Sequence, residues 1–274
     1  MSRALFAAWL LAAPLGVAGP FDQAFDDLYN FNFAGAHAVL DEYIAKHPQE
    51  PLPYAMRGSA YLFRELDRLG ILEGEFFVDD KRIIDKKKLK PDPDIRARFL
   101  TAVDSARSRA QTVLDGNPND RDALFAMCVT QGIATDYMAL VERRQVASLI
   151  PMRQSNNYAQ QLLRIDPHYY DAYLTTGLSE YLVGSLPFFI RWFIHFDNVS
   201  GSKQKGVDIL LTVARQGHYL KPFAKILLSI AYLRDKDPRR TRDLLAELYR
   251  QYPSNPLFKK ELDKVQAQLG AFAN

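Results

Sequence analysis

Two short stretches of this 274-residue sequence hold residue types that could bind an anion or a metal ion. The first, 200-SGSKQKG-206, places glycine and lysine ahead of a helical pattern, where backbone N–H groups can cradle a phosphate. It lacks the GxxxxGK[ST] order of a phosphate-binding loop, so a turn with a polar helix cap explains it better. The second, 166-DPHYYD-171, could offer Asp166, His168 and Asp171 to a metal ion. Its position in a turn between two helical patterns explains these residues without a metal.

The other reactive side chains form no constellation for catalysis. The five histidines show neither an HExxH motif nor a paired spacing that suits zinc, and the chain has no CxxC pair and no GxSxG elbow. The one cysteine, Cys128, stands in an apolar run, where a buried structural thiol is favoured over a reactive one. We therefore expect a protein that is not an enzyme, with no catalytic residues, no cofactor and no metal ion.

The N-terminus has the three parts of a secretory signal peptide. A positive MSR start precedes the apolar run ALFAAWLLAAPL, and small residues lead to a cleavage point after Ala18. This run is shorter than the roughly 20 residues that span a bilayer, although an uncleaved anchor or a buried helix are alternatives. A single cysteine excludes an intrachain disulfide, and export without disulfides fits a bacterial periplasm. We expect a signal peptide at 1–18 and one exported, periplasmic domain at 19–274.

Helical patterns separated by prolines fill the mature chain, and almost no segment has the alternation of a strand. In the second helix of each expected hairpin a small residue stands twelve positions before the proline that follows, or before His218 in the fourth copy. Small residues at a recurring point let two helices approach closely. These five positions are Ala36, Ala106, Ser155, Gly206 and Thr241.

The first helices of the hairpins repeat as well. The segments 53-PYAMRGSAY-61, 172-AYLTTGLSEY-181 and 224-AKILLSIAY-232 each place a small residue near the start and a tyrosine beyond it. Together with the small residues and prolines above, this pattern resembles the tetratricopeptide repeat across 21–253. The last copy, 221–253, is near the standard length of about 34 residues, and the others are longer.

The resemblance implies an all-α fold: a right-handed α–α superhelix, or α solenoid, of about five irregular hairpins with a C-terminal capping helix. The expected units are 21–48, 51–118 with an insertion at 62–98, 121–167, 170–218 and 221–253, followed by the cap at 256–270.

The stretch 181-YLVGSLPFFIRWFIHF-196 is unusually apolar and aromatic. A glycine and a proline interrupt it, and its charged residues oppose a membrane span, so we read a helix, a break and a second helix. Core packing is the simplest role for the helix 186–196; a ligand pocket and an interfacial membrane helix are the alternatives. Gly177, the triplet Ser185-Leu-Pro187, the apolar helix and 201-GSKQKGVDILL-211 follow in order over 177–211. This pattern resembles the tetratricopeptide-39 and inclusion-body-clearance family, which implies a non-enzymatic scaffold.

These features lead to an exported, non-catalytic scaffold or adaptor for protein–protein interaction in the cell envelope, with the partner in a concave groove. The candidate groove residues are Tyr54, Tyr61, Tyr173 and Tyr181. The alternative is a lipid carrier or sensor, or a membrane-docking module. It would use the aromatic helix 186–196 through Arg191, Trp192, Phe193 and His195. A formal net charge of only +3, with scattered basic residues, argues against a nucleic-acid partner.

Overall fold

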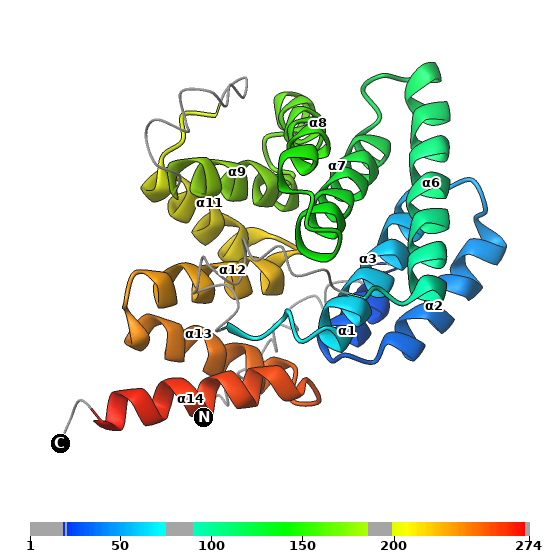
Figure 1. Cartoon of the computed structure of the whole chain (residues 1–274). Helices are drawn as coiled ribbons and strands as arrows, with labels where there is room; N and C mark the ends of the chain where they lie inside the picture. The colour runs from blue at the N-terminus through cyan, green and yellow to red at the C-terminus, as the bar shows by residue number, and fades with distance from the viewer. Residues whose placement is uncertain (1–18, 20, 75–89, 186–198, 272–274) are drawn as a thin grey trace, which may run out of the picture.

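The structure is a computed structural model that describes residues 19, 21–74, 90–185 and 199–271. Every regular element in these ranges is helical, so the predicted all-α class is confirmed (Figure 1). The helices pack as adjacent pairs along the chain. The pairs are α1 (Asp22–Tyr29) with α2 (Phe33–Lys46), α3 (Leu52–Arg68) with α6 (Pro93–Gly116), α7 (Arg121–Asp136) with α8 (Gln145–Ile165), α9 (Tyr173–Ser185) with α11 (Lys203–Gln216), and α12 (Lys221–Arg234) with α13 (Pro238–Gln251); α14 (Pro256–Ala271) follows.

The five small residues that the sequence singles out lie where the two helices of each pair meet. All five are buried. Two of them also form a hydrogen bond to the other helix of the pair. The Ser155 hydroxyl donates to the Cys128 carbonyl oxygen at 2.7 Å, and the Thr241 hydroxyl donates to the Ser229 carbonyl oxygen at 3.5 Å. The prediction that these positions permit close helix contact is confirmed.

The connection between α3 and α6 is shorter than the insertion expected at 62–98. Helix α3 runs on to Arg68 because Leu62 and Leu66 are buried in a cluster with Phe99 of α6. Asp92 then begins α6 by accepting backbone N–H groups of its first turn, with Pro93 in the position where proline is tolerated. Only 69–92 therefore lies between the two helices, and 75–89 falls outside the described residues.

Two buried glutamates hold the chain where α6 and α11 begin. The Glu65 side chain in α3 accepts the backbone N–H of Asp92 at 2.8 Å. The Glu180 side chain in α9 accepts those of Ser200 at 3.0 Å and Ser202 at 3.1 Å. Each carboxylate thus replaces the partners that these N–H groups would otherwise find in water.

The stretch Arg121–Val141, which covers α7 and a short π-helix, is long and apolar enough to cross a membrane. In the structure 56% of its most apolar 18 residues are buried, and α7 lies against α3, α6 and α8. Packing against these three helices therefore accounts for the apolar composition of this stretch.

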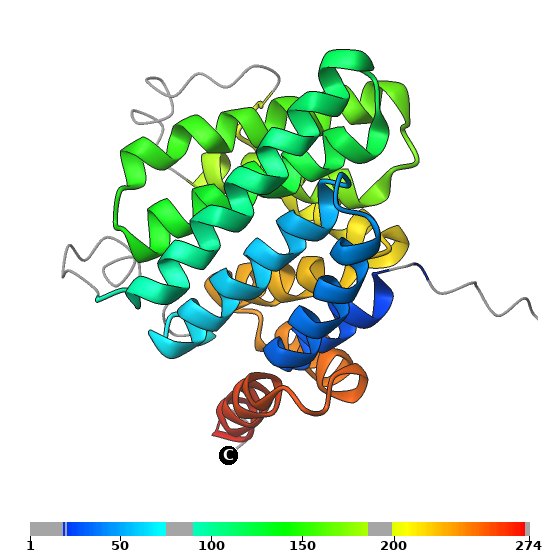
Figure 2. The ribbon, with the colours of Figure 1, turned by 90° about the vertical axis from the view of Figure 1, so that its right-hand side faces the viewer.

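The first helices of the chain contact the last ones, as Figures 1 and 2 show. The Phe25 ring of α1 stacks on Tyr219, with centroids 4.7 Å apart, and the Tyr29 hydroxyl donates to the Tyr219 carbonyl oxygen at 2.9 Å. The Asn255 side-chain amide donates to the Tyr29 carbonyl oxygen at 2.8 Å. In an ideal solenoid each repeat contacts only its neighbours. Here the first hairpin also packs against the end of the chain.

Candidate functional site

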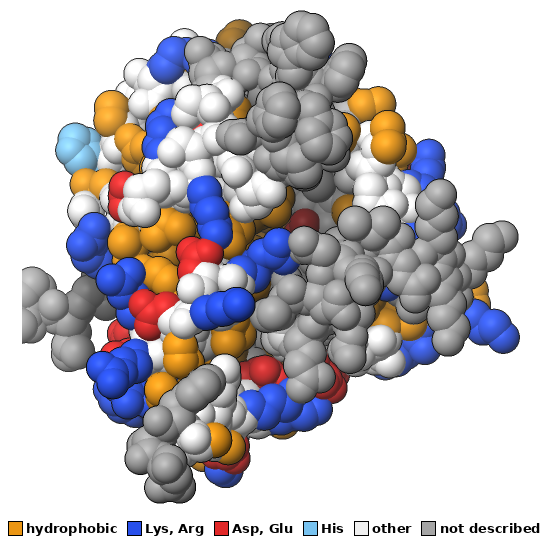
Figure 3. All heavy atoms as spheres, turned by 60° about the vertical axis from the view of Figure 1, so that its left-hand side comes forward, with side chains coloured by type: hydrophobic (Ala, Val, Ile, Leu, Met, Phe, Trp, Pro, Cys, Tyr) orange, Lys and Arg blue, Asp and Glu red, His pale blue; other side chains and the backbone are white. Residues whose placement is uncertain are grey.

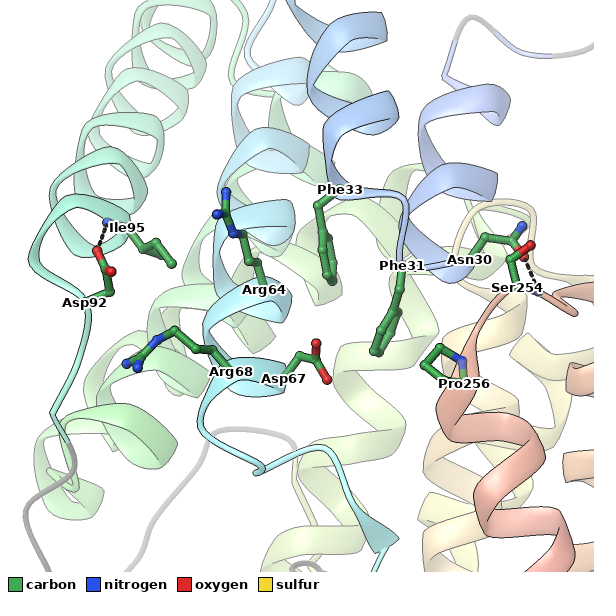
Figure 4. A pocket seen from close by; sticks show the side chains of 10 residues that line it. All are labelled: Asn30, Phe31, Phe33, Arg64, Asp67, Arg68, Asp92, Ile95, Ser254 and Pro256. Atoms are coloured by element: carbon green, nitrogen blue, oxygen red, sulfur yellow. Dashed lines mark hydrogen bonds between the residues drawn. The ribbon is translucent and has the colours of Figure 1, made fainter.

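A pocket of about 580 Å³ opens between the first hairpin, the second hairpin and the turn that precedes α14 (Figure 4). It brings together the turn before α2, the last turns of α3, the start of α6 and the turn between α13 and α14. Its lining residues are Asn30, Phe31, Phe33, Arg64, Asp67, Arg68, Asp92, Ile95, Ser254 and Pro256.

Phe31 occupies a backbone position that normally belongs to glycine. The Phe31 backbone N–H donates to the Leu28 carbonyl oxygen, and the Asn32 backbone N–H donates to the Asp27 carbonyl oxygen. These two bonds define a Schellman turn in which Phe31, with φ 61°, is the left-handed residue. The same turn ends α3, where Gly70 fills the position at φ 68°. A bulky residue with this φ costs about 1 kcal/mol relative to glycine.

The strained turn places the Phe31 ring in the pocket, close to the ring of Phe33. The two centroids are 5.2 Å apart, with the planes tilted by 34°. Both rings line the pocket and are only partly buried (Figure 4). The pair therefore offers an aromatic wall for an apolar group.

Arg64 and Asp67 supply opposite charges on one side of the pocket. Among the residues that the structure describes, neither side chain has a hydrogen-bond or ion-pair partner, and in Figure 4 they point in different directions. Burial raises the pKa of the Asp67 carboxyl above its usual value. The neighbouring Arg68 is engaged, because its guanidinium donates to Glu65 and to the Lys90 carbonyl oxygen.

This arrangement can hold a polypeptide segment. The Arg64 guanidinium can donate to a carbonyl or carboxylate oxygen, and the Asp67 carboxylate can accept an N–H group. An apolar side chain can lie against Phe31 and Phe33. Two charges of opposite sign next to two rings suit a segment with both polar and apolar groups better than a lipid tail.

The four tyrosines predicted from the sequence are not brought together in this pocket. Tyr54 and Tyr181 are buried in different packing clusters, with exposed fractions of 7% and 6%. Tyr61 is half-buried with its ring 4.3 Å from that of His37, and Tyr173 lies beside Tyr170. Arg191, Trp192, Phe193 and His195, with the whole helix 186–196, lie outside the described residues.

The stretch 200–206 contains the predicted helix cap. The Ser202 side chain accepts the Lys205 backbone N–H at 3.3 Å and begins α11. The Lys205 ammonium group is 2.6 Å from the Glu180 carboxylate. A turn with a polar cap therefore explains this stretch.

The two aspartates of 166–171 serve different partners. Asp166 pairs with Arg121 at 2.7 Å, whereas Asp171 accepts the backbone N–H groups of three consecutive residues, 218–220, where α12 begins. Within the described ranges no cluster of three potential metal ligands occurs. The prediction of a buried thiol is confirmed, because Cys128 is 2% exposed and burial raises its pKa.

Asp136, the last residue of α7, is an acidic residue that no sequence pattern singles out. Burial raises its pKa from 3.8 to about 7. The folded protein therefore binds a proton that the unfolded chain releases near pH 4, and stability falls as the pH rises from about 4 to about 7. We expect Asp136→Asn to be more stable than the wild type by about 2 kcal/mol at pH 8 and to match it at pH 4.

Urea unfolding at both pH values measures this difference. Asp104→Asn is the matched control, because the Asp104 side chain is 72% exposed in a surface pair with Arg107. An Asp136→Asn variant that is no more stable than the wild type at pH 8 would mean that the carboxylate is well solvated in the folded protein.

The sequence carried one weak signal for the pocket. A turn between two helical patterns, 30-NFNF-33, holds two phenylalanines and no glycine, although α1 ends there. The charged residues of the pocket carried none, because they lie on other elements, at the end of α3 and the start of α6, 33 to 61 positions after Phe31. Comparisons of the chain with family models, with curated proteins and with solved structures found no match.

Proposed function

We propose that this chain is a non-catalytic scaffold of the cell envelope that binds a segment of a partner protein in the pocket between the Phe31 turn, α3, the start of α6 and the turn before α14. The observation that carries the proposal is the Phe31 turn. A left-handed phenylalanine costs stability where glycine would not, and such strain is characteristic of functional sites. The charged side chains of Arg64 and Asp67, which have no partner in the described part of the chain, lie beside it and supply polar groups for a peptide.

The same proposal includes two further properties. The chain is exported, and its hairpins follow one another as a right-handed, tetratricopeptide-like superhelix. The five helix pairs, each with a buried small residue at the matching place, support the repeat. The contacts of Tyr29 with Tyr219 and Asn255 support a partner site in the pocket in preference to an open concave face. The lipid-carrier alternative depends on 186–196 and stays a prediction from the sequence.

Phe31→Gly tests the proposal because it separates binding from folding. The substitution removes the aromatic wall and relieves the strained turn, so we expect the free energy of unfolding to stay within about 1 kcal/mol of the wild type. The tagged protein is purified from the envelope of cells that produce it naturally, and its partners are quantified by mass spectrometry. We expect a stoichiometric partner with the wild type and at least a tenfold loss of it with Phe31→Gly.

Lys236→Gly is the matched control. Lys236 fills the same left-handed position, at φ 57°, in the turn after α12, and it does not line the pocket. This variant should keep the partner. Equal recovery of the partner by Phe31→Gly and Lys236→Gly would show that the pocket is not the binding site.

A further inference from the structure

Asp22, the first residue of α1, uses both oxygens of its carboxylate. The Oδ2 atom accepts the Gly19 backbone N–H at 2.6 Å, and the Oδ1 atom lies 2.8 Å from the His218 Nε2 atom. The Asp22 side chain is only 30% exposed, so water screens these contacts only in part. Asp22 therefore joins the Gly19 nitrogen to the turn that precedes α12.

The chain is packed against this turn from Gly19 onwards. A Cβ atom at Gly19 would lie 2.8 Å from the Tyr219 hydroxyl oxygen and 3.1 Å from the His218 ring, so the backbone passes close to both side chains. The Phe21 side chain is 5% exposed. Its ring centroid is 4.7 Å from that of Tyr43 and 6.3 Å from that of Tyr219. The Gly19 nitrogen is thus held in a defined place beside a carboxylate.

The segment that starts at Gly19 is acidic. From Gly19 to Ala45 the sequence has neither lysine nor arginine, and it has five acidic residues: Asp22, Asp26, Asp27, Asp41 and Glu42. On the side of the molecule that Figure 3 brings forward, by contrast, Lys and Arg side chains lie next to Asp and Glu side chains. A chain that begins at Gly19 places an α-amino group, which is positive at neutral pH, at the start of the acidic segment.

We propose that removal of residues 1–18 creates an ion pair between the Gly19 α-amino group and the Asp22 carboxylate, and that this pair completes the docking of α1 on the turn before α12. The inference rests on the export proposed above, with cleavage after Ala18. A peptidase of the exporting membrane hydrolyses the Ala18–Gly19 bond with one water molecule. The Ala18 carbonyl takes the oxygen and becomes a carboxylate, and both protons go to the Gly19 nitrogen, which becomes an ammonium group.

Cleavage changes the strength of a contact that is already formed. In the precursor the Gly19 nitrogen is an uncharged amide. The ammonium group keeps an N–H donor for Asp22 and adds a positive charge opposite the carboxylate. Helix α1 runs from this terminus to the Phe31 turn, so the ion pair stabilises the helix whose end carries that turn. The exported protein therefore holds its first helix more firmly than the precursor does.

The experiment compares two chains, 19–274 and 17–274, each released from a fusion so that no residue is added. The longer chain keeps Val17 and Ala18, so its Gly19 nitrogen stays an amide and its α-amino group lies two residues away. At low salt we expect the melting temperature of 19–274 to be higher by about 3 °C. Hydrogen exchange of the α1 amides should be slower in 19–274. Asp22→Asn should abolish both differences.

Asp27→Asn is the matched control. It removes one negative charge from the same helix, but the Asp27 carboxylate accepts the Asn32 side-chain amide at 2.8 Å and does not bond Gly19. Both differences between the two chains should remain in this variant. Equal melting temperatures and equal exchange of the two wild-type chains would overturn the proposal, as would differences that survive Asp22→Asn.

The intact mass of the protein purified from the cell envelope separates this inference from the proposed export. We expect the mass of 19–274. A chain that starts elsewhere would contradict both cleavage after Ala18 and the ion pair. A chain that starts at Gly19 but is no more stable than 17–274 would overturn the ion pair and leave export standing.

Discussion

Glu180→Gln is expected to lower the free energy of unfolding at pH 7 by about 3 kcal/mol. The Glu180 side chain is 3% exposed and accepts hydrogen bonds from the Ser200 hydroxyl at 2.9 Å and the Lys205 ammonium group at 2.6 Å, besides the N–H groups of Ser200 and Ser202. A glutamine amide turns one acceptor into a donor, so at least one of these buried donors loses its partner.

The loss should depend on pH. Burial alone raises the pKa of Glu180, but the hydrogen bonds from Lys205 and from the serines outweigh it and lower the pKa to about 2. A carboxyl with a lowered pKa contributes stability above its usual value of 4.5, and this contribution is lost as the pH falls towards 2. The wild type and Glu180→Gln should therefore differ most at pH 7 and become similar near pH 2.

Urea unfolding followed by circular dichroism at pH 7, 5 and 3 measures the effect. Glu42→Gln provides the control, because Glu42 forms an exposed ion pair with Lys46, in which both side chains are more than 60% exposed. Removal of such an exposed pair should leave the free energy of unfolding almost unchanged. If the free energy of unfolding fell by an equally small amount in both variants, the Glu180 carboxylate would not stabilise the start of α11.

Gly206→Ala is expected to cost about 3 kcal/mol, although alanine is the better helix former. A Cβ atom at Gly206 would lie 2.5 Å from the Tyr181 backbone N and 2.8 Å from the Gly177 carbonyl oxygen. These are backbone atoms of α9 and cannot turn away like a side chain. Helices α9 and α11 would therefore have to separate, and the packing of Tyr181 and Leu210 between them would loosen.

Gly270→Ala is the matched control for this change. It makes the same substitution inside α14, where a Cβ atom would meet nothing within 4 Å. We expect a gain of up to about 1 kcal/mol from helix propensity alone. The melting temperatures of the two variants should move in opposite directions; a Gly206→Ala protein as stable as the wild type would show that α9 and α11 are packed less closely than the structure has them.

The sequence by itself determined the helices and their pairing. Proline and cap residues such as Asp92 and Ser202 act within one turn of their own helix, so their effect can be read locally. The small residues, from Ala36 to Thr241, mark the contact between two helices that follow each other directly in the chain. Both signals depend on short separations and on a regular period.

Only the tertiary structure decided where the pocket lies and which polar groups are buried. The pocket joins residues from 30 to 256. The Ser254 N–H donates to the Asn30 side chain and the Asn255 side-chain amide donates to the Tyr29 carbonyl oxygen, and these bonds bring the two ends of the pocket together. The burial of Tyr54 and Tyr181, which the sequence analysis assigned to a partner surface, depends on neighbouring hairpins in the same way. Contacts between distant segments leave no period in the sequence, because each of their residues is also compatible with an exposed helix face.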